Sequence, residues 1–376
     1  FFSTMLILYA FLLVFCVHAV QWTDELCQAQ ESLMNSLPEY SNNRARKMTK
    51  AKFQASVSRF PCAEGPSSRE CLGMHRCRML PSWSTNREEI LQLMPDFLEL
   101  WWKRPIKLNT WGMLFPHQFG FYWFLRQLQP EVVIENGVRR GLTTWLIRQA
   151  VPDVKIFSFD PGLASFAGRK QKKHDVLLYY DPNATYYLGG SYRCGKEAEQ
   201  RHLWPRGIKR FQDWSTCDWS WANKDKVLIL FDDHMNIGER VAQMRKLGFI
   251  HALYDDNHPS GATNFATPHD ACDFTNPRMY AHESETLTSS ERLATYESLA
   301  AYWEFPPVLF HPVIAAAWIN RFMRINDTLR NCILSELSPM PLIQTVGQLQ
   351  QYNLTTIAFD EMAGYFWLVW LKIRSG

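Results

Sequence analysis

The sequence predicts an α/β fold built on a doubly wound, mostly parallel sheet, and three observations carry this prediction. From about residue 105 onwards, short apolar runs alternate with helical patterns, which is typical of parallel strands buried on both faces. Acidic or glycine-containing segments follow these runs, at the positions where open α/β sheets bind ligands. Of the 376 residues, 47% are hydrophobic and 20% are charged, which excludes a disordered, collagen-like or coiled-coil chain.

The strands and helices follow in a regular order. Parallel strands are predicted from apolar runs at 132–135, 154–160, 226–231 and 249–254. Helices are predicted at 87–102, 116–128, 143–151 and 237–248. Two later strands, at 354–359 and 365–373, are predicted to form an antiparallel hairpin through the short link at 360–364. The result is a Rossmann-like sheet with right-handed crossovers and a C-terminal antiparallel hairpin.

The beginning of the chain is predicted to be a leader. Residues 5–20 carry no charge and are short for a membrane span, which needs about 20 apolar residues. They fit a signal peptide cleaved after Ala19, although the usual preceding positive charge is missing; an uncleaved signal anchor in the membrane stays open. The predicted organisation is a leader over 1–19, a cysteine-containing extension over 20–104 and a main domain over 105–376.

Cysteines and glycosylation sequons predict the secretory pathway, either the Golgi or ER lumen or the cell exterior. The chain has nine cysteines, and Cys16 lies in the leader, so an even number remains for disulfides in an oxidising compartment. Sequons for N-glycosylation begin at Asn183, Asn326 and Asn353. The pairing of the cysteines cannot be deduced from the sequence.

A glycine-containing loop joins the first predicted strand to its helix. Gly137 and Gly141 permit a tight turn and a close approach of a ligand to the backbone. Asp160 ends the next strand, where a carboxylate can accept both ribose hydroxyls of a nucleoside cofactor. Together with Glu135 these residues are the predicted cofactor-binding set. The spacing is G-x-x-x-G, not the GxGxxG of dinucleotide binders, and the alternative is a plain turn that uses glycine for packing.

Two acidic pairs follow neighbouring predicted strands. Asp232 and Asp233 follow one strand, and Asp255 and Asp256 follow the next. Because parallel strands end at the same edge of a sheet, the four carboxylates should converge and repel one another unless protons or a cation neutralise them. Oxygen-rich clusters suit Mg²⁺, Mn²⁺ or Ca²⁺. The prediction is a divalent-cation site, with Mg²⁺ the expected ion; the alternative is that each pair caps a helix.

His234 follows the first acidic pair directly. Its ordinary pKa lies near neutrality, so it can take a proton from a hydroxyl that the cation has polarised. His234 and Asp233 are therefore the predicted catalytic residues.

These motifs resemble a known family. The segment VVIENGVRRGLTTWLIRQAVPDVKIFSFDP is similar to the first two motifs of class I S-adenosylmethionine-dependent methyltransferases. More narrowly, the chain resembles their cephalosporin hydroxylase-like and macrocin O-methyltransferase-like branch. The resemblance is good across residues 105–260 and holds only in outline at the C-terminal strands. In that branch two acidic blocks hold a divalent cation, and a nearby histidine serves as base for methylation of sugar or polyketide hydroxyls. The matching positions are Asp232, Asp233, His234, Asp255 and Asp256. The second block, often Glu-Asp in the branch, is Asp-Asp here.

The resemblance implies S-adenosylmethionine and a divalent cation as cofactors, and a hydroxyl of a sugar, glycan or small molecule as substrate. S-adenosylmethionine is made in the cytosol, which leaves open a non-catalytic module that kept only the fold. A metal-dependent glycosyltransferase is a third alternative, against which the loop with Asp160 argues. The formal net charge of +3, from 40 Lys and Arg against 37 Asp and Glu, predicts no nucleic-acid partner. The oligomeric state stays open.

Overall fold

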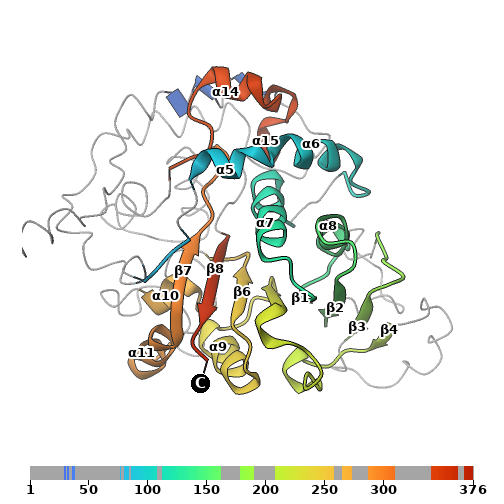
Figure 1. The fold of residues 1–376 in the computed structure, drawn as a ribbon, viewed down its shortest axis with the longest axis vertical. Coiled ribbons are helices and arrows are strands. Elements are labelled where there is room, and N and C mark those ends of the chain that lie inside the picture. Colours follow the sequence, from blue (N-terminus) through green and yellow to red (C-terminus); the bar gives the residue numbers. More distant parts are fainter. Residues whose placement is uncertain are drawn as a thin grey trace, which may run out of the picture.

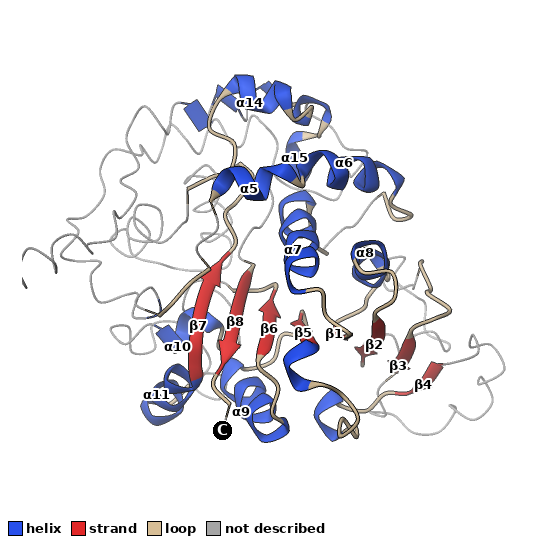
Figure 2. Cartoon of the chain, viewed as in Figure 1, coloured by secondary structure: helices blue, strands red, loops and turns tan. Residues whose placement is uncertain are grey.

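The computed structural model describes residues 86–107, 112–161, 178–189, 208–257, 265–272, 287–309, 340–362 and 368–375, with scattered residues between 29 and 83. The strands are β1 Val132–Asn136, β2 Lys155–Asp160, β3 Thr185–Leu188, β4 Ile208–Arg210, β5 Val227–Phe231, β6 His251–Tyr254, β7 Leu299–Glu304 and β8 Val369–Ile373. The helices are α5 Arg87–Gln92, α6 Met94–Lys103, α7 Phe115–Leu128, α8 Leu142–Ala150, α9 Ile237–Leu247, α10 Pro268–Cys272, α11 Ser289–Ser298, α14 Val346–Gln351 and α15 Phe359–Met362. Figures 1 and 2 show them as one sheet with helices on both faces.

The described strands form an eight-stranded sheet in the order β4-β3-β2-β1-β5-β6-β8-β7. All neighbours from β4 to β6 pair in parallel, and β8 runs antiparallel to both β6 and β7. This confirms the predicted mostly parallel sheet with an antiparallel pair, and it matches the class I methyltransferase fold that the resemblance implies. Because β8 opposes both of its neighbours, β6 and β7 have their carboxyl ends at the same edge of the sheet.

Two hydrophobic cores lie on the two faces of the sheet. Successive residues of a strand point to opposite faces. Val133 of β1 therefore packs into the core that contains α7 and α8, while Val132 and Ile134 pack into the core that contains α9. Every residue of β1 and of β5 is buried, which is why both read as continuous apolar runs in the sequence.

The prediction of a strand at 354–359, the first strand of the C-terminal hairpin, is wrong. Residues 354–356 form a 3-10 turn and 359–362 form α15, whereas β8 pairs with β6 and β7. Leu354 and Ile357 are both buried, at a spacing of three residues that suits a helical turn, and Asn353 starts the turn with a φ of +52°. The apolar, β-branched composition of this stretch is shared by strands and buried turns, so composition misled the prediction.

Helices α5 and α6 confirm the predicted helix at 87–102, with a break at Leu93 before Pro95. Phe97 of α6 packs on Phe115 and Phe119 of α7, with ring centroids 5.4 and 5.2 Å apart. The end of the predicted extension therefore shares a core with the sheet domain. Among the described residues no helix has the length and apolar character to cross a membrane; the predicted leader lies outside them.

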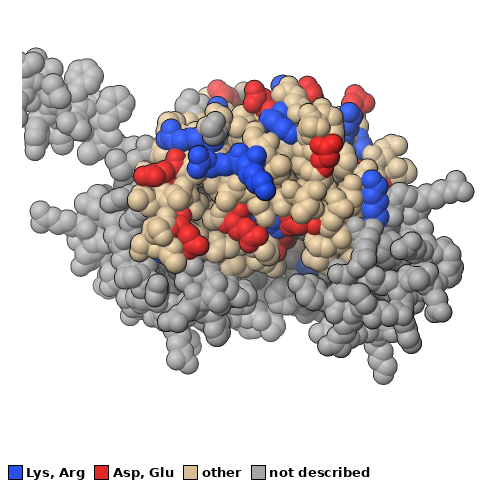
Figure 3. All heavy atoms as spheres, turned by 90° about the horizontal axis from the view of Figure 1, so that it is seen from below, with Lys and Arg blue, Asp and Glu red and all other residues tan. Residues whose placement is uncertain are grey.

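One disulfide joins distant parts of the described chain, between Cys77 and Cys272. Cys217 carries a free thiol. The other predicted disulfide cysteines lie outside the described residues. Acidic and basic side chains are interspersed on the face shown in Figure 3, as expected from the near-balanced charge of the chain.

Candidate active site

The loop after β1 lies wedged between the ends of two neighbouring strands. The Gly137 amide donates to the carbonyl of Phe159 on β2 at 2.9 Å, and the Asp232 amide donates to the carbonyl of Asn136 at 2.8 Å. Gly137 has a φ of +97°, and a Cβ at this position would lie 2.2 Å from the Asp232 carbonyl oxygen. Only glycine fits there, because the loop backbone lies directly against the backbone of Asp232. The predicted cofactor loop therefore contacts the first acidic pair.

Asp160 holds this loop from the end of β2. Its Oδ2 accepts the backbone amides of Val138 and Arg139 at 3.0 and 2.8 Å. Arg139 and Gly141 both have positive φ, so the loop is tightly turned before α8 begins. The structure thus brings together three of the predicted cofactor residues, Gly137, Gly141 and Asp160, and the hydrogen bonds of Asp160 shape the loop.

Glu135, the fourth predicted cofactor residue, lies beneath the loop and is fully buried. Its Oε2 accepts the hydroxyls of Thr144 at 2.7 Å and Ser158 at 2.5 Å, which join β1 to α8 and β2. Burial raises the pKa of this carboxyl to about 7, although both hydroxyls act in the opposite direction. The position of Glu135 is that of a brace for the loop.

The raised pKa of Glu135 predicts a pH-dependent stability. A carboxyl whose pKa is about 7 when folded and near 4.5 when unfolded stabilises the fold fully below pH 4.5 and loses that effect as the pH rises through 7. We expect Glu135→Gln to gain about 3 kcal/mol relative to the wild type between pH 4.5 and pH 8. Urea unfolding across this range measures the difference; parallel profiles for the two proteins would contradict the assignment.

Three side chains converge at the carboxyl edge beside the loop. Asp232, His234 and Asp256 each offer one ligand atom, and these atoms all lie within 4.8 Å of one another. His234 Nε2 lies 2.7 Å from Asp256 Oδ2. His234 has a φ of +57°, and its largely exposed ring stacks on Phe265 with centroids 5.3 Å apart. We call these three residues the acid–histidine cluster.

The carboxylates in and around the acid–histidine cluster repel one another. Burial raises the pKa of Asp232 well above its ordinary value, and Asp255, Asp256 and Asp233 raise it further, whereas Arg139 lowers it. The hydrogen bond to Asp256 raises the pKa of His234. Several acidic groups therefore crowd this edge of the sheet, and a divalent cation would offset their negative charge.

Asp233 lies apart from the acid–histidine cluster. Its Oδ2 pairs with Arg240 Nη2 of α9 at 2.6 Å, and Arg240 Nη1 also pairs with Asp213 at 2.9 Å. Oδ1 accepts the amide of Met235 at 3.2 Å, so Asp233 shapes the start of the segment that leads to α9. This predicted ligand and catalytic residue thus takes a place in a buried ion-pair network.

Asp255 lies at the predicted edge of the sheet but contacts a side chain outside the acid–histidine cluster. Its Oδ1 lies 3.0 Å from Nδ1 of His117, and both side chains are buried. His117 belongs to the first turn of α7, so this contact brings α7 against the end of β6. Of the four predicted carboxylates, Asp232 and Asp256 offer ligand atoms together with His234, while Asp233 and Asp255 each contact a side chain outside this cluster.

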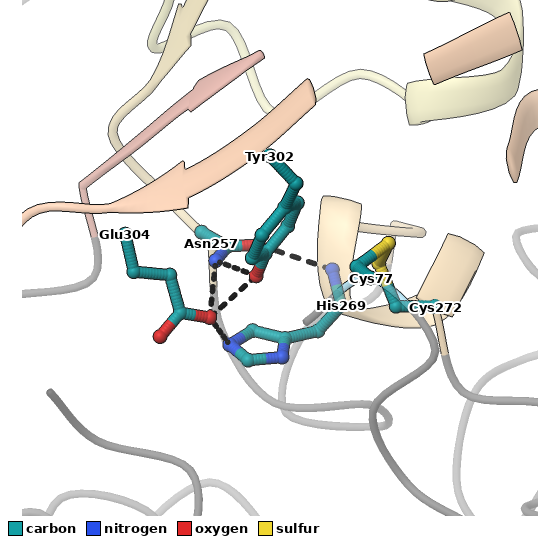
Figure 4. Close-up of a disulfide and its surroundings, with 6 residues drawn as sticks. All are labelled: Cys77, Asn257, His269, Cys272, Tyr302 and Glu304. Carbon is teal, nitrogen blue, oxygen red and sulfur yellow. Dashed lines mark hydrogen bonds and ion pairs between the residues drawn. A yellow bond between two sulfur atoms is a disulfide. The ribbon is translucent and has the colours of Figure 1, made fainter. Parts of the chain in front are cut away.

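A second polar group occupies the same edge of the sheet, between β6, β7 and α10 (Figure 4). Glu304 ends β7, Asn257 follows β6, and His269 Nε2 lies 3.2 Å from Glu304 Oε1. Asn257 Nδ2 donates to the Tyr302 hydroxyl at 2.9 Å, and that hydroxyl donates to Glu304. These four side chains, the β7–α10 network, were not among the predicted site residues. No strand was predicted at β7, so nothing in the sequence placed Glu304 at this edge.

Comparisons with known proteins found similarity among solved structures. No model of a known protein family matches the chain, and no curated protein matches it. The chain is similar to the apo structure of CmcI at 13% identity and a TM-score of 0.23, covering 38% of this chain and 52% of that one. It therefore spans about half the length of CmcI.

Two further solved structures are named as methyltransferases and contain S-adenosylmethionine. The O-methyltransferase TomG from Streptomyces achromogenes, involved in tomaymycin synthesis, is 14% identical over 61% of this chain and 86% of that one, with a TM-score of 0.29. Human N-acetylserotonin methyltransferase is 10% identical over 87% of this chain and 71% of that one, with a TM-score of 0.27.

Proposed function

We propose that the chain is an S-adenosylmethionine-dependent, divalent-metal-assisted O-methyltransferase that acts on a hydroxyl of a sugar, glycan or small molecule in the secretory pathway. One observation carries the proposal: the glycine loop and the acid–histidine cluster meet at Asp232. Gly137 packs on the backbone of Asp232, and the carboxylate of the same residue faces His234 and Asp256. A loop suited to a nucleoside and a cluster suited to a cation thus lie side by side.

The donor set of the acid–histidine cluster fits a divalent cation. Carboxylate oxygens are the ligands that Mg²⁺ and Mn²⁺ prefer, and Asp232 and Asp256 supply two. Burial and the neighbouring carboxylates raise the pKa of Asp232, and a bound cation would relieve the repulsion between these carboxylates. A bound cation would polarise the acceptor hydroxyl and lower its pKa. Asp232 and Asp256 would hold it, and His234 would accept the proton of the hydroxyl.

The loop fits a nucleoside cofactor. Gly137 and Gly141 leave the backbone without side chains where β1 ends, and α8 begins directly after the loop. Asp160, at the end of β2, offers a carboxylate to ribose hydroxyls. S-adenosylmethionine would supply an electrophilic methyl group, and the chain's residues would orient it towards the acceptor oxygen.

Two features support the secretory pathway. The Cys77–Cys272 disulfide suits an oxidising compartment. Asn183 and Asn353 of two sequons are exposed on the described surface, where they would be accessible for glycosylation. A luminal enzyme needs imported S-adenosylmethionine, and glycans are the hydroxyl-rich substrates of that compartment.

A second candidate is a non-catalytic module, and the contacts of Asp160 favour it. Oδ2 of Asp160 accepts two backbone amides of the glycine-containing loop after β1, at the position where a ribose would bind. In such a module the loop would be held for structure and the acid–histidine cluster would serve only as a binding surface.

Calorimetric titration of S-adenosylmethionine into the purified protein, with and without Mg²⁺, separates the two candidates. We expect micromolar binding, and at least about tenfold weaker binding by Asp160→Ala, since that variant loses both the ribose acceptor and the brace of the loop. Asp153→Ala, in the turn before β2, is the matched control and should bind as the wild type does. A folded wild-type protein that binds no cofactor would instead support the non-catalytic module.

A further inference from the structure

Residues 265–272, which we call the α10 segment, touch the acid–histidine cluster from one side. Phe265 at its start stacks on His234, with ring planes 23° apart. Further along, the backbone amide of His269 donates to Oδ1 of Asn257 at 3.0 Å. Asn257 directly follows Asp256 in the chain. One short segment therefore bears on two of the three cluster residues.

The α10 segment reaches Asn257 through buried polar contacts. His269, Asn257 and Tyr302 are each at most 5% exposed, and Glu304 Oε1 accepts from both Tyr302 and Asn257 while it faces His269. Buried polar groups of this kind are costly unless all are satisfied, so the β7–α10 network permits few arrangements. The backbone beside Asp256 is fixed as a result.

A disulfide and a backbone hydrogen bond anchor the same segment. Cys272, its last residue, is bonded to Cys77 (Figure 4). Pro81, shortly after Cys77, accepts the amide of Tyr302 of β7 at 3.3 Å, and Ala266 accepts the amide of Ile237 of α9 at 3.0 Å. The segment is thereby tied to β7 at one end and to α9 at the other.

We infer that the α10 segment is the positioning element of the proposed cation site, with Phe265 and His269 as positioning residues for His234 and Asp256. The inference rests on the proposed function, because it concerns the same cluster. Residues that orient metal ligands commonly change metal affinity about 10- to 100-fold when they are replaced. Neither Phe265 nor His269 needs to touch the ion to have this effect.

Binding of Mn²⁺ alone tests the inference without any turnover. The loss of the free-ion signal in electron paramagnetic resonance measures this binding. His269→Ala is expected to weaken Mn²⁺ binding about tenfold. His269→Gln should restore much of it, because its amide can donate to Glu304. His251→Ala is the control: it removes a partly buried histidine, stacked on Trp370, from the opposite end of β6 and should leave Mn²⁺ affinity unchanged.

Phe265→Leu provides a second arm that leaves the buried network intact, and it should weaken Mn²⁺ binding severalfold. Thermal unfolding of each variant shows that it is folded. If the wild type binds Mn²⁺ and the His269 and Phe265 variants bind it equally well, the positioning role is overturned while the proposed function stands. If the folded wild type binds no Mn²⁺, the cation site itself is refuted and the positioning role falls with it.

Discussion

Asp232→Asn is expected to weaken Mn²⁺ binding by more than about 100-fold, beyond the effect typical of residues that only orient ligands. Asp232 is the centre of the repulsive cluster, and its carboxylate is one of two that can hold the ion. Removal of its charge also relieves repulsion with Asp255 and Asp256, so the metal-free variant should unfold at a higher temperature than the wild type. Mn²⁺ titration and thermal unfolding measure the two effects.

Asp233→Asn is the matched control, since it makes the same chemical change one residue away. It removes the buried ion pair with Arg240 and should cost about 3 kcal/mol of stability. This is the low end of the range for a buried pair, because Arg240 retains its ion pair with Asp213. Its Mn²⁺ affinity should stay unchanged. Equal loss of Mn²⁺ binding in both asparagine variants would show that the structure assigns the ligands wrongly.

His234→Ala separates a base from a ligand within the same experiment. As the base, His234 is expected to contribute about 100-fold or more to turnover. Its loss should leave S-adenosylmethionine binding intact and weaken Mn²⁺ binding only severalfold, as Phe265→Leu does, because the imidazole also contacts Asp256. A large fall in Mn²⁺ affinity in this variant would identify the imidazole as the third ligand.

Gly137→Ala is expected to cost at least about 3 kcal/mol of folding free energy and to abolish cofactor binding. The new Cβ would meet the carbonyl of Asp232 at 2.2 Å, and the φ of +97° is itself unfavourable for alanine. Relief of the clash must push the loop away from β5, which moves both proposed binding sites. Denaturant unfolding and calorimetry with S-adenosylmethionine record the outcome.

Gly248→Ala isolates the backbone part of this effect. Gly248 ends α9 with a φ of +77°, and the nearest atom to an added Cβ is Lys224 Cγ at 3.7 Å. The variant should lose only the conformational cost of about 1–2 kcal/mol and bind the cofactor normally. If Gly137→Ala were no more harmful than Gly248→Ala, the close contact of the loop with Asp232 would be in error.

The parallel half of the fold could be predicted because its strands are buried on both faces. β1, β2, β5 and β6 all lie within one or two residues of their predicted bounds, and Gly248 ends α9 as expected. β7 escaped prediction because α11 passes into it at Leu299 with no glycine or proline between them. The short, partly polar β3 and β4 gave no clear apolar run.

The location of the candidate site could be predicted from the sequence, but not which side chains form it. The rule that parallel strands end together brought Asp232 and Asp256 to one edge. Whether each carboxylate faces the site depends on partners from distant elements, such as Arg240 for Asp233 and His117 for Asp255. These partners become neighbours only through packing, which residue spacing along the chain does not encode.

The insertion of β8 between β6 and β7 makes the β7–α10 network depend on β8. In the described sheet β7 is an edge strand whose pairing partner is β8, the last strand in sequence. Glu304 therefore reaches His269 and Asn257 only once β8 has joined the sheet. A chain interrupted before β8 could still bring Asp232 and Asp256 together, but the β7–α10 network would be missing. The network is thus complete only when β8 is paired with β7, which makes the proposed cation site depend on the whole described sheet.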